Sequence, residues 1–307
     1  MSKAYVFNGY GGYGGHDGQE LIDRPVPEPG PGEMTVEVRA AGVNPVDWEL
    51  RSGHLDQAQD LPVPWGQEVS GVVTALGEGV QDFSVGDEIL GPVAPGHGGF
   101  AEHTIVRAEA VVAKPEEISF ADAAAIPVAG TTAYDGTHQI ELEAGQTLLI
   151  LGIGGEVGLM AAQIGKVHKF TVIGTGSEVK RDIAASTGAT LVPYGDDLSA
   201  RIRTIAPAGV DLILDLVGGQ ALREVADLVP DPSRIISAAD SATATELGGS
   251  ALQRTTEALA KITDVIEYGL VDPHVTALYP LERAREAIAT VENGHAMGKV
   301  VIEMSGA

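Results

Sequence analysis

The chain has 307 residues, a length of about two domains, and its 44% hydrophobic and 20% charged residues are an ordinary globular composition. A net charge of −24 argues against nucleic acid or an anionic membrane as a partner, because both are bound through clustered Lys and Arg. The absence of Cys excludes disulfides and thiolate metal ligands, and with no secretory or membrane-spanning segment evident, a cytoplasmic protein is expected.

Up to about residue 120 the chain reads as short strands broken by Gly and Pro. Residues 34–40 alternate with period two, as a half-buried strand does. The Pro-rich segment 24–32 is a loop, because Pro cannot donate to a ladder. Further strands are predicted at 69–77 and 104–106, and at 85–90 a turn that enters a strand. This part predicts a compact antiparallel barrel.

From about residue 145 apolar strands alternate with helices. The predicted strands are 148–153, 171–175, 190–194, 212–217 and 234–238, and the predicted helices are 156–168, 178–187, 199–205 and 220–229. This pattern predicts a parallel sheet covered on both faces. Ser250 is predicted to cap a long helix that starts with 251–261 and ends near Tyr268-Gly269. The strand–helix–strand tail at 274–303 is expected to rejoin the first domain.

A glycine-rich turn follows the first of these strands. Residues 148–151 run into Gly152-Ile153-Gly154-Gly155-Glu156-Val157-Gly158 and then into a helix. Gly permits close backbone approach, and a helix start offers N–H groups, so this turn predicts a dinucleotide pyrophosphate site. Glu156 is the unusual member, since its carboxylate would repel a bound pyrophosphate unless it points outward.

The end of the second strand favours NADP(H) over NAD(H). An acidic residue about 20 residues after the glycine motif would bind the ribose 2′-hydroxyl, and no acid precedes Glu178. Ser177, Lys180 and Arg181 instead offer a hydroxyl and two cations to a 2′-phosphate. Glu178 lies among these cations and keeps open the alternative of a solvated helix start.

Six segments carry a family resemblance. They are 41–48 (AGVNPVDW), 85–89 (VGDEI), 130–134 (GTTAY), the glycine turn, 215–219 (DLVGG) and 295–300 (HAMGKV). In this order they closely resemble the medium-chain dehydrogenase/reductase superfamily, in its zinc-free quinone oxidoreductase (zeta-crystallin-like) branch. The resemblance implies an α/β fold with a GroES-like β-barrel domain at 1–122 and 268–307. It also implies a doubly wound Rossmann domain for NADP(H) at 123–267.

The sequence departs from the family after the fifth Rossmann strand. Residues 240–250 contain no β-branched apolar run, so we expect the sixth strand to be missing or shortened. Family members form a common dimer edge to edge through that strand. A homo-oligomer is therefore possible, but this dimer is in doubt.

The resemblance also implies site residues. Zinc-dependent relatives carry metal ligands at the positions of Asn44, Gln67 and Val128, and two amides and a Val do not hold Zn²⁺. We therefore expect Asn44 and Gln67 to donate hydrogen bonds to a substrate oxygen. A turn former before Pro45 is the alternative for Asn44, and a surface amide is the alternative for Gln67.

The resemblance implies ligand-binding roles for several other positions, and each of them also has an ordinary structural explanation. Thr132 is expected at the nicotinamide carboxamide or as a helix cap, and Tyr194 near the adenine or as a strand end. Val217 and Gly218 end the fourth strand on the side where ligands bind, and the alternative is that the glycines 218 and 219 simply start the next helix. Asp47 and Trp48 line the substrate cleft in this interpretation, although a core Trp is the commoner reason for such a residue.

The sequence thus predicts a zinc-independent, NADPH-dependent oxidoreductase that transfers hydride to quinones or α,β-unsaturated carbonyls. One alternative is a reductase of saturated ketones or aldehydes. Another is a non-enzymatic NADP(H)-binding redox sensor or structural protein. The expected partner is a small-molecule substrate.

Overall fold

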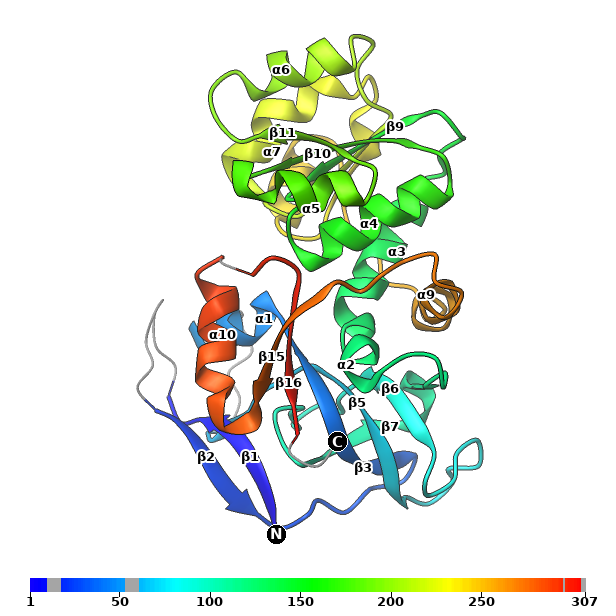
Figure 1. The fold of residues 1–307 in the computed structure, drawn as a ribbon, viewed down its shortest axis with the longest axis vertical. Helices are drawn as coiled ribbons and strands as arrows, with labels where there is room; N and C mark the ends of the chain where they lie inside the picture. Colours follow the sequence, from blue (N-terminus) through cyan, green and yellow to red (C-terminus); the bar gives the residue numbers. More distant parts are fainter. Residues whose placement is uncertain (10–17, 53–60, 295, 305–307) are drawn as a thin grey trace. The chain divides into compact units, whose positions relative to one another are not determined.

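The computed structural model describes residues 1–9, 18–52, 61–294 and 296–304 (Figure 1). His295 of the last family segment lies outside the described residues. The chain divides into two compact units, one of residues 1–128 and 275–307 and one of residues 129–274. The sequence predicts these borders at 122/123 and 267/268.

The first unit contains two sheets. The larger one has the order β15-β16-β3-β5-β6-β8, with β7 also paired to β3, and the smaller one has the order β2-β1-β4. The strands are β1 Ser2–Phe7, β2 Gln19–Arg24, β3 Glu33–Val43, β4 Val63–Pro64, β5 Glu68–Leu76, β6 Glu88–Pro92, β7 His103–Arg107, β8 Val112–Ala113, β15 Val275–Pro280 and β16 Lys299–Glu303. The helices are α1 Pro45–Ser52, α2 Phe120–Ala123 and α10 Ala284–Glu292, with 3₁₀ turns at Ala108–Ala110 and Leu281–Arg283.

The carboxyl-terminal segment completes the first unit. β16 pairs antiparallel with β3, in the register Val300 to Val43, and β15 pairs parallel with β16. Figure 1 shows β15 and β16, in orange and red, beside the blue strand β3. The tail at 274–303 therefore returns to the sheet formed by the first part of the chain.

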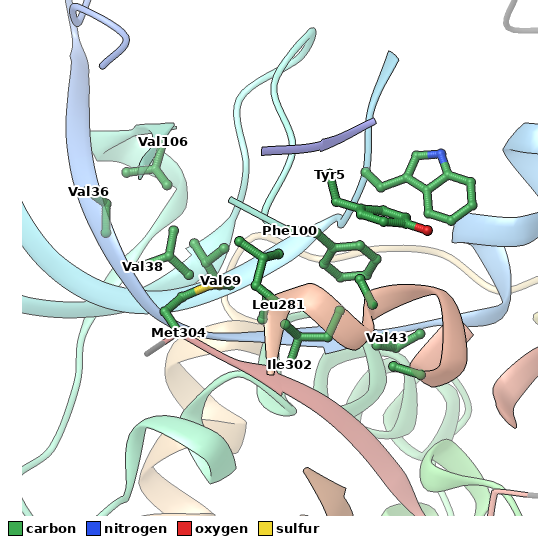
Figure 2. Close-up of a cluster of buried hydrophobic side chains, with 14 of the residues drawn as sticks. Tyr5, Val36, Val38, Val43, Val69, Phe100, Val106, Leu281, Ile302 and Met304 are labelled. Atoms are coloured by element: carbon green, nitrogen blue, oxygen red, sulfur yellow. The ribbon is translucent and has the colours of Figure 1, made fainter. Parts of the chain in front are cut away.

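The core of the first unit explains the period-two pattern of β3. Met34, Val36 and Val38 alternate along the strand and are buried. Figure 2 shows side chains of β3, β5 and β16 gathered with Tyr5, Phe100 and Leu281. Trp65 packs here against Phe7, with ring centroids 5.3 Å apart. Burial of these apolar surfaces stabilises the sheets from which the polar residues below project.

The second unit is a doubly wound parallel sheet with the order β11-β10-β9-β12-β13-β14. Its strands are β9 Thr147–Leu151, β10 Thr171–Gly176, β11 Thr190–Pro193, β12 Leu212–Asp215, β13 Ile235–Ser237 and β14 Ser250–Ala251. Its helices are α3 Thr131–His138, α4 Glu156–Val167, α5 Arg181–Ser186, α6 Leu198–Ile205, α7 Gly219–Val225, α8 Ser241–Glu246 and α9 Ala258–Glu267, with 3₁₀ turns at Glu178–Lys180, Ala226–Leu228 and Pro232–Arg234. A π-helical turn at Ile126–Gly130 precedes α3. The central strands are continuous buried apolar runs, as expected for a sheet covered on both faces.

The sixth strand confirms the predicted departure from the family. β14 has only two residues, Ser250 and Ala251, and both pair with β13. The segment 240–250 instead forms the short helix α8, with Asp240 at its N-cap. The expectation of a missing or shortened sixth strand is thus met by a two-residue strand.

The helix predicted from residue 251 to near Tyr268 starts later than predicted, and its end agrees with the structure. α9 begins at Ala258, and Ser250 belongs to β14 rather than capping a helix. The reason is tertiary. The Asp135 carboxylate of α3 accepts hydrogen bonds from Thr255 N and Thr255 Oγ1, at 3.2 and 2.6 Å. These bonds hold the intervening segment outside the helix, against its local propensity.

Candidate active site

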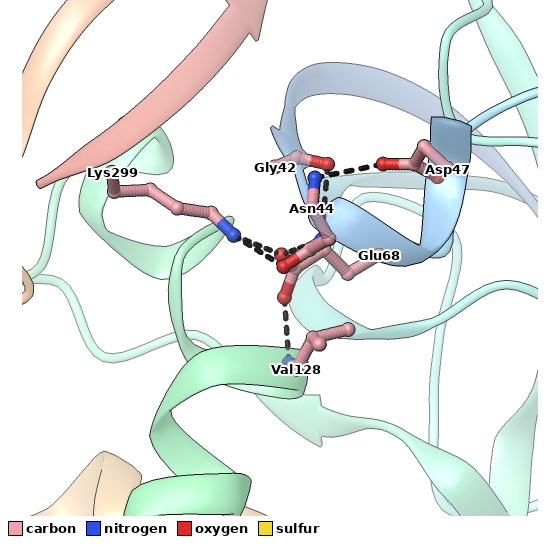
Figure 3. A network of polar contacts seen from close by, with 6 residues as sticks. All are labelled: Gly42, Asn44, Asp47, Glu68, Val128 and Lys299. Carbon is pink, nitrogen blue, oxygen red and sulfur yellow. Dashed lines mark hydrogen bonds and ion pairs between the residues drawn. The ribbon is translucent and has the colours of Figure 1, made fainter. Parts of the chain in front are cut away.

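A buried polar network lies at one end of three neighbouring strands of the first unit. Asn44 follows β3, Glu68 begins β5 and Lys299 begins β16. All three residues are at most 1% exposed. The Lys299 ammonium donates to Glu68 Oε1 at 2.7 Å and to Asn44 Oδ1 at 2.8 Å. Figure 3 shows these side chains directed toward one another.

The two charges determine how the Asn44 amide is oriented. An ammonium group only donates and a carboxylate only accepts hydrogen bonds. The amide oxygen of Asn44 therefore faces Lys299, and the amide nitrogen faces Glu68. Asn44 Nδ2 donates to Glu68 Oε1 at 2.6 Å, and a second contact from Nδ2 reaches Gly42 O at 3.4 Å. The side chain that was predicted to donate to a substrate is thus buried and bonded within the protein. Its role toward a substrate stays a prediction.

Gly42 and Val128 complete the surroundings of the Glu68 carboxylate. Its Oε2 accepts from Val128 N at 2.7 Å. A Cβ at Gly42 would overlap Glu68 Oε1 and lie 2.5 Å from Ala124 O, so only Gly leaves room for the carboxylate. Two of the three positions matched to zinc ligands, Asn44 and Val128, therefore donate to Glu68.

Asp47 lies against this network from the first turn of α1. Its Oδ2 accepts from Asn44 N at 2.8 Å, which caps the start of the helix. The residue is 1% exposed, and burial raises the pKa of its carboxyl to about 7.

Trp48 and Gln67 are the other two residues predicted for the substrate site. Trp48 is half-buried and packs against the core of the first unit. Gln67 is half-buried, and its backbone oxygen accepts from Val93 N at 3.0 Å. Glu68 and Lys299 were missed as site residues, although Glu68 directly follows the predicted residue Gln67 and Lys299 belongs to the family segment 295–300.

The raised pKa of Asp47 predicts a pH dependence of stability. The folded protein keeps a proton on Asp47 that the unfolded chain releases near pH 4, so this contribution is complete below pH 4 and is lost as the pH rises through about 7. The loss amounts to at most about 4 kcal/mol. Denaturant unfolding of wild type and Asp47→Asn between pH 4 and 8 measures it. Wild type should weaken relative to the variant as the pH rises, and parallel curves would contradict the assignment.

The glycine turn of the second unit joins β9 to α4. Gly152 has a φ of +90°, and its N–H donates to Thr175 O of the neighbouring strand at 3.1 Å. A Cβ at Gly158 would lie 2.6 Å from Ile153 Cα, so this Gly permits the close approach of helix and turn. Gly155 is the N-cap of α4 and supplies no capping side chain. Gly155 is exposed, while Glu156 and Val157 are half-buried.

The segment after β10 places the predicted 2′-phosphate ligands in different surroundings. Lys180 is buried, its pKa is lowered by burial, and its side chain covers Gly154, where a Cβ would lie 2.6 Å from Lys180 Cγ. Arg181 is exposed and bound through two hydrogen bonds, of 2.6 and 2.8 Å, to the Glu178 carboxylate. Ser177 is exposed. A 2′-phosphate at Arg181 would therefore compete with Glu178.

Asp215 organises the carboxyl end of β12. Its Oδ1 accepts from Val217 N and Gly218 N, at 3.0 and 2.8 Å, and its Oδ2 accepts from Ser237 Oγ at 2.6 Å. Val217 is 45% exposed, and a Cβ at Gly152 would lie 2.9 Å from its Cγ2. The structure therefore brings Val217 beside the glycine turn, and the roles of Val217 and Gly218 toward a cofactor stay predictions.

Two further predicted cofactor residues are Tyr194 and Thr132. Tyr194 is 45% exposed, and its N–H donates to Gly176 O at 2.9 Å, so it continues the β11 pairing with β10. Thr132 is buried in the first turn of α3. Their roles toward a cofactor stay predictions.

The described part of the chain has neither a cluster of metal-ligand residues nor a membrane-spanning helix. No group of three or more His, Cys, Asp or Glu is arranged to hold a metal ion there. None of the helices described has the length and apolar character needed to cross a membrane.

Comparisons with known proteins agree with both units. The family described as Alcohol dehydrogenase GroES-like domain matches residues 30–116, and the family described as Zinc-binding dehydrogenase matches residues 187–302. The chloroplastic NADPH-dependent alkenal/one oxidoreductase of Arabidopsis thaliana is 31% identical, over 98% of this chain and 79% of that protein. The quinone oxidoreductase of Sus scrofa is 30% identical, over 91% and 92% of the two chains.

A solved structure extends the likeness to the fold. The quinone oxidoreductase from Coxiella burnetii superposes with a TM-score of 0.89 at 27% identity, covering 98% of this chain and 99% of that one. The GroES-like sheet, the doubly wound sheet with its glycine turn and the relatives at 30% identity or more lead to one assignment. The chain belongs to the medium-chain dehydrogenase/reductase superfamily of oxidoreductases.

Proposed function

We propose that this protein is an NADPH-dependent oxidoreductase that transfers hydride to quinones or α,β-unsaturated carbonyls without a catalytic metal. The observation that carries the proposal is the Asn44 amide held between Lys299 and Glu68, at a position where zinc-dependent relatives have a metal ligand. The named relatives support the substrate class, since they are a quinone oxidoreductase and an alkenal/one oxidoreductase.

The residues at the zinc positions do not fit the metal. Asn44 and Gln67 are neutral amides and Val128 has an alkyl side chain, whereas Zn²⁺ takes thiolate, imidazole or carboxylate ligands. The Asn44 oxygen already accepts from the Lys299 ammonium, and a second cation there would be repelled. No step of the proposed reaction uses a metal.

The second unit fits a nicotinamide dinucleotide. Gly155 at the N-cap of α4 leaves the helix start open to an anion, and the pyrophosphate would lie against Gly154, Gly155 and Val157. Val217 and Gly218 would flank it, with Thr132 and Tyr194 toward the nicotinamide and adenine ends. Ser177, Lys180 and Arg181 would take the 2′-phosphate. When bound, the reduced cofactor supplies a hydride, which is two electrons and one proton.

A conjugated acceptor suits the donors that this chain offers. Hydride addition at the far carbon of an enone spreads the negative charge into an enolate, and addition to a quinone gives a hydroquinone anion. Hydrogen-bond donors such as Asn44 and Gln67 then stabilise the oxygen, each by a few kcal/mol in a dry site. A second proton from solvent completes a two-electron, two-proton reduction.

The test is an assay of NADPH oxidation against quinones, enones and saturated ketones or aldehydes, with Kd titrations of NADPH and NADH. We expect turnover with the conjugated acceptors and tighter binding of NADPH. Turnover restricted to saturated carbonyls would instead assign a ketone or aldehyde reductase. Cofactor binding without any turnover would assign a redox sensor or structural protein, and equal affinity for NADH would contradict the roles of Lys180 and Arg181.

Two further proposals concern the whole protein. We place it in the cytoplasm, the location expected from its sequence. We also propose that it does not form a dimer through β14, because two residues offer little backbone for edge-to-edge pairing. A sedimentation measurement on wild type and on a variant with a charged residue at Ala251 tests this, since a dimer through β14 would dissociate in the variant.

A further inference from the structure

The register of the sheet brings Lys299 and Glu68 to Asn44. Val300 pairs with Val43 between β16 and β3, so Lys299 comes level with Asn44. Val69 pairs with Ala41 between β5 and β3, so Glu68 comes level with Gly42, whose missing side chain leaves room for the carboxylate. The chain thus brings one cation and one anion, 231 residues apart in sequence, to opposite ends of a single amide.

We propose that Lys299 and Glu68 are positioning residues that orient and polarise the Asn44 amide as a hydrogen-bond donor, an inference that rests on the proposed function. Lys299 draws electron density toward the amide oxygen, and this strengthens the N–H groups as donors. Glu68 Oε1 accepts a hydrogen bond from one of these N–H groups, with 2.6 Å between Asn44 Nδ2 and the oxygen. The other has only the 3.4 Å contact to Gly42 O, and it is the group that turns to a substrate oxygen.

Stability alone does not account for this pair. Both side chains are 0% exposed, and the desolvation of a buried pair offsets much of its attraction. Replacing both partners of such a pair by neutral residues of similar volume is often neutral for folding, whereas removing one partner is costly. The strands β3, β5 and β16 are already joined by their backbone ladders. The pair therefore serves the orientation of the amide between the charges.

The experiment compares Lys299→Met, Glu68→Gln and the double variant in thermal unfolding, NADPH affinity and quinone kinetics. Each single variant should be less stable than wild type. The double variant should recover most of that stability and keep its NADPH Kd within about 2-fold, while kcat stays at least about 10-fold low. If stability and kcat return together in the double variant, the role is structural and the proposal is overturned.

A second Lys–Glu pair of the first unit provides the control. Lys114 Nζ lies 2.9 Å from Glu88 Oε2, with side chains 4% and 44% exposed. The variant Lys114→Met/Glu88→Gln should leave kcat within about 2-fold of wild type, as expected for a pair that touches neither Asn44 nor the glycine turn. A loss of kcat equal to that of the first double variant would mean that any such pair has this effect, and would overturn the proposal.

A spectroscopic measurement separates this inference from the proposed function. In a ¹⁵N NMR spectrum, the Asn44 Nδ2 signal, assigned by its loss in Asn44→Ala, should be shifted from the range of exposed amides. The shift should disappear in the double variant. An Asn44 signal at the ordinary position in wild type overturns the proposal even if the double variant does not fold. Absence of turnover in wild type contradicts the proposed function instead. The shift of the Asn44 Nδ2 signal then still tests whether the two charges orient the amide.

Discussion

Replacing Glu292 by Ala is expected to lower the free energy of unfolding by about 3–5 kcal/mol, because it leaves a buried guanidinium without its carboxylate. Arg51 Nη2 lies 2.6 Å from Glu292 Oε1, and the side chains are 1% and 2% exposed. Arg51 Nε and Nη1 have no hydrogen-bond partner among the described residues. The pair joins α1, which follows Asn44, to α10 near the end of the chain.

A matched control lies on the same helix. Glu286 of α10 pairs with Arg283, and both side chains are 55% exposed, so Glu286→Ala should cost less than about 1 kcal/mol. Both variants exchange Glu for Ala in the same helix, so the intrinsic helix propensities that change are the same, although Glu286 lies in the first turn and Glu292 at the last residue. Denaturant unfolding of the two variants and wild type at neutral pH measures the difference. Equal losses would contradict the assignment of a buried, uncompensated charge at Arg51.

The secondary structure of both sheets could be predicted because its signals are local. The period-two pattern of 34–40 marks β3, and the continuous apolar runs mark the central strands β9, β10 and β12. The glycine turn was recognisable since strand, turn and helix follow each other within one short segment. The weakness of the sixth strand was equally local, as it rests on the absence of β-branched apolar residues before Ser250.

The partners of Asn44 could not be predicted from local sequence. Glu68 and Lys299 reach Asn44 through strand pairing over separations of 24 and 255 residues, and nothing near Asn44 indicates a buried cation. The late start of α9 has the same origin, because Thr255 donates a hydrogen bond to Asp135, which lies 120 residues earlier in the sequence. Ion pairs within one helical turn are the opposite case: Glu178 and Arg181 are three residues apart, and this spacing already suggests their contact.

The glycine turn gives the second large expected effect. A Cβ at Gly158 would lie 2.6 Å from Ile153 Cα and 2.7 Å from Gly152 O, and backbone atoms cannot rotate away as a side chain can. In Gly158→Ala the start of α4 must move from the turn, at a cost of about 1–3 kcal/mol. If the turn binds the pyrophosphate, the NADPH Kd should rise at least about 10-fold, since the N–H groups of the helix start are displaced.

Gly155→Ala separates packing from binding in the same turn. Gly155 has a φ of −89°, and the nearest atom to its Cβ would be Gly152 O at 3.8 Å, an ordinary contact. This variant should fold with a stability within about 1 kcal/mol of wild type. A methyl group there nevertheless obstructs an anion that approaches the exposed backbone, so NADPH affinity should fall while stability is kept. Unchanged NADPH affinity in Gly155→Ala would show that the pyrophosphate does not approach this residue, and the loss in Gly158→Ala would then reflect packing alone.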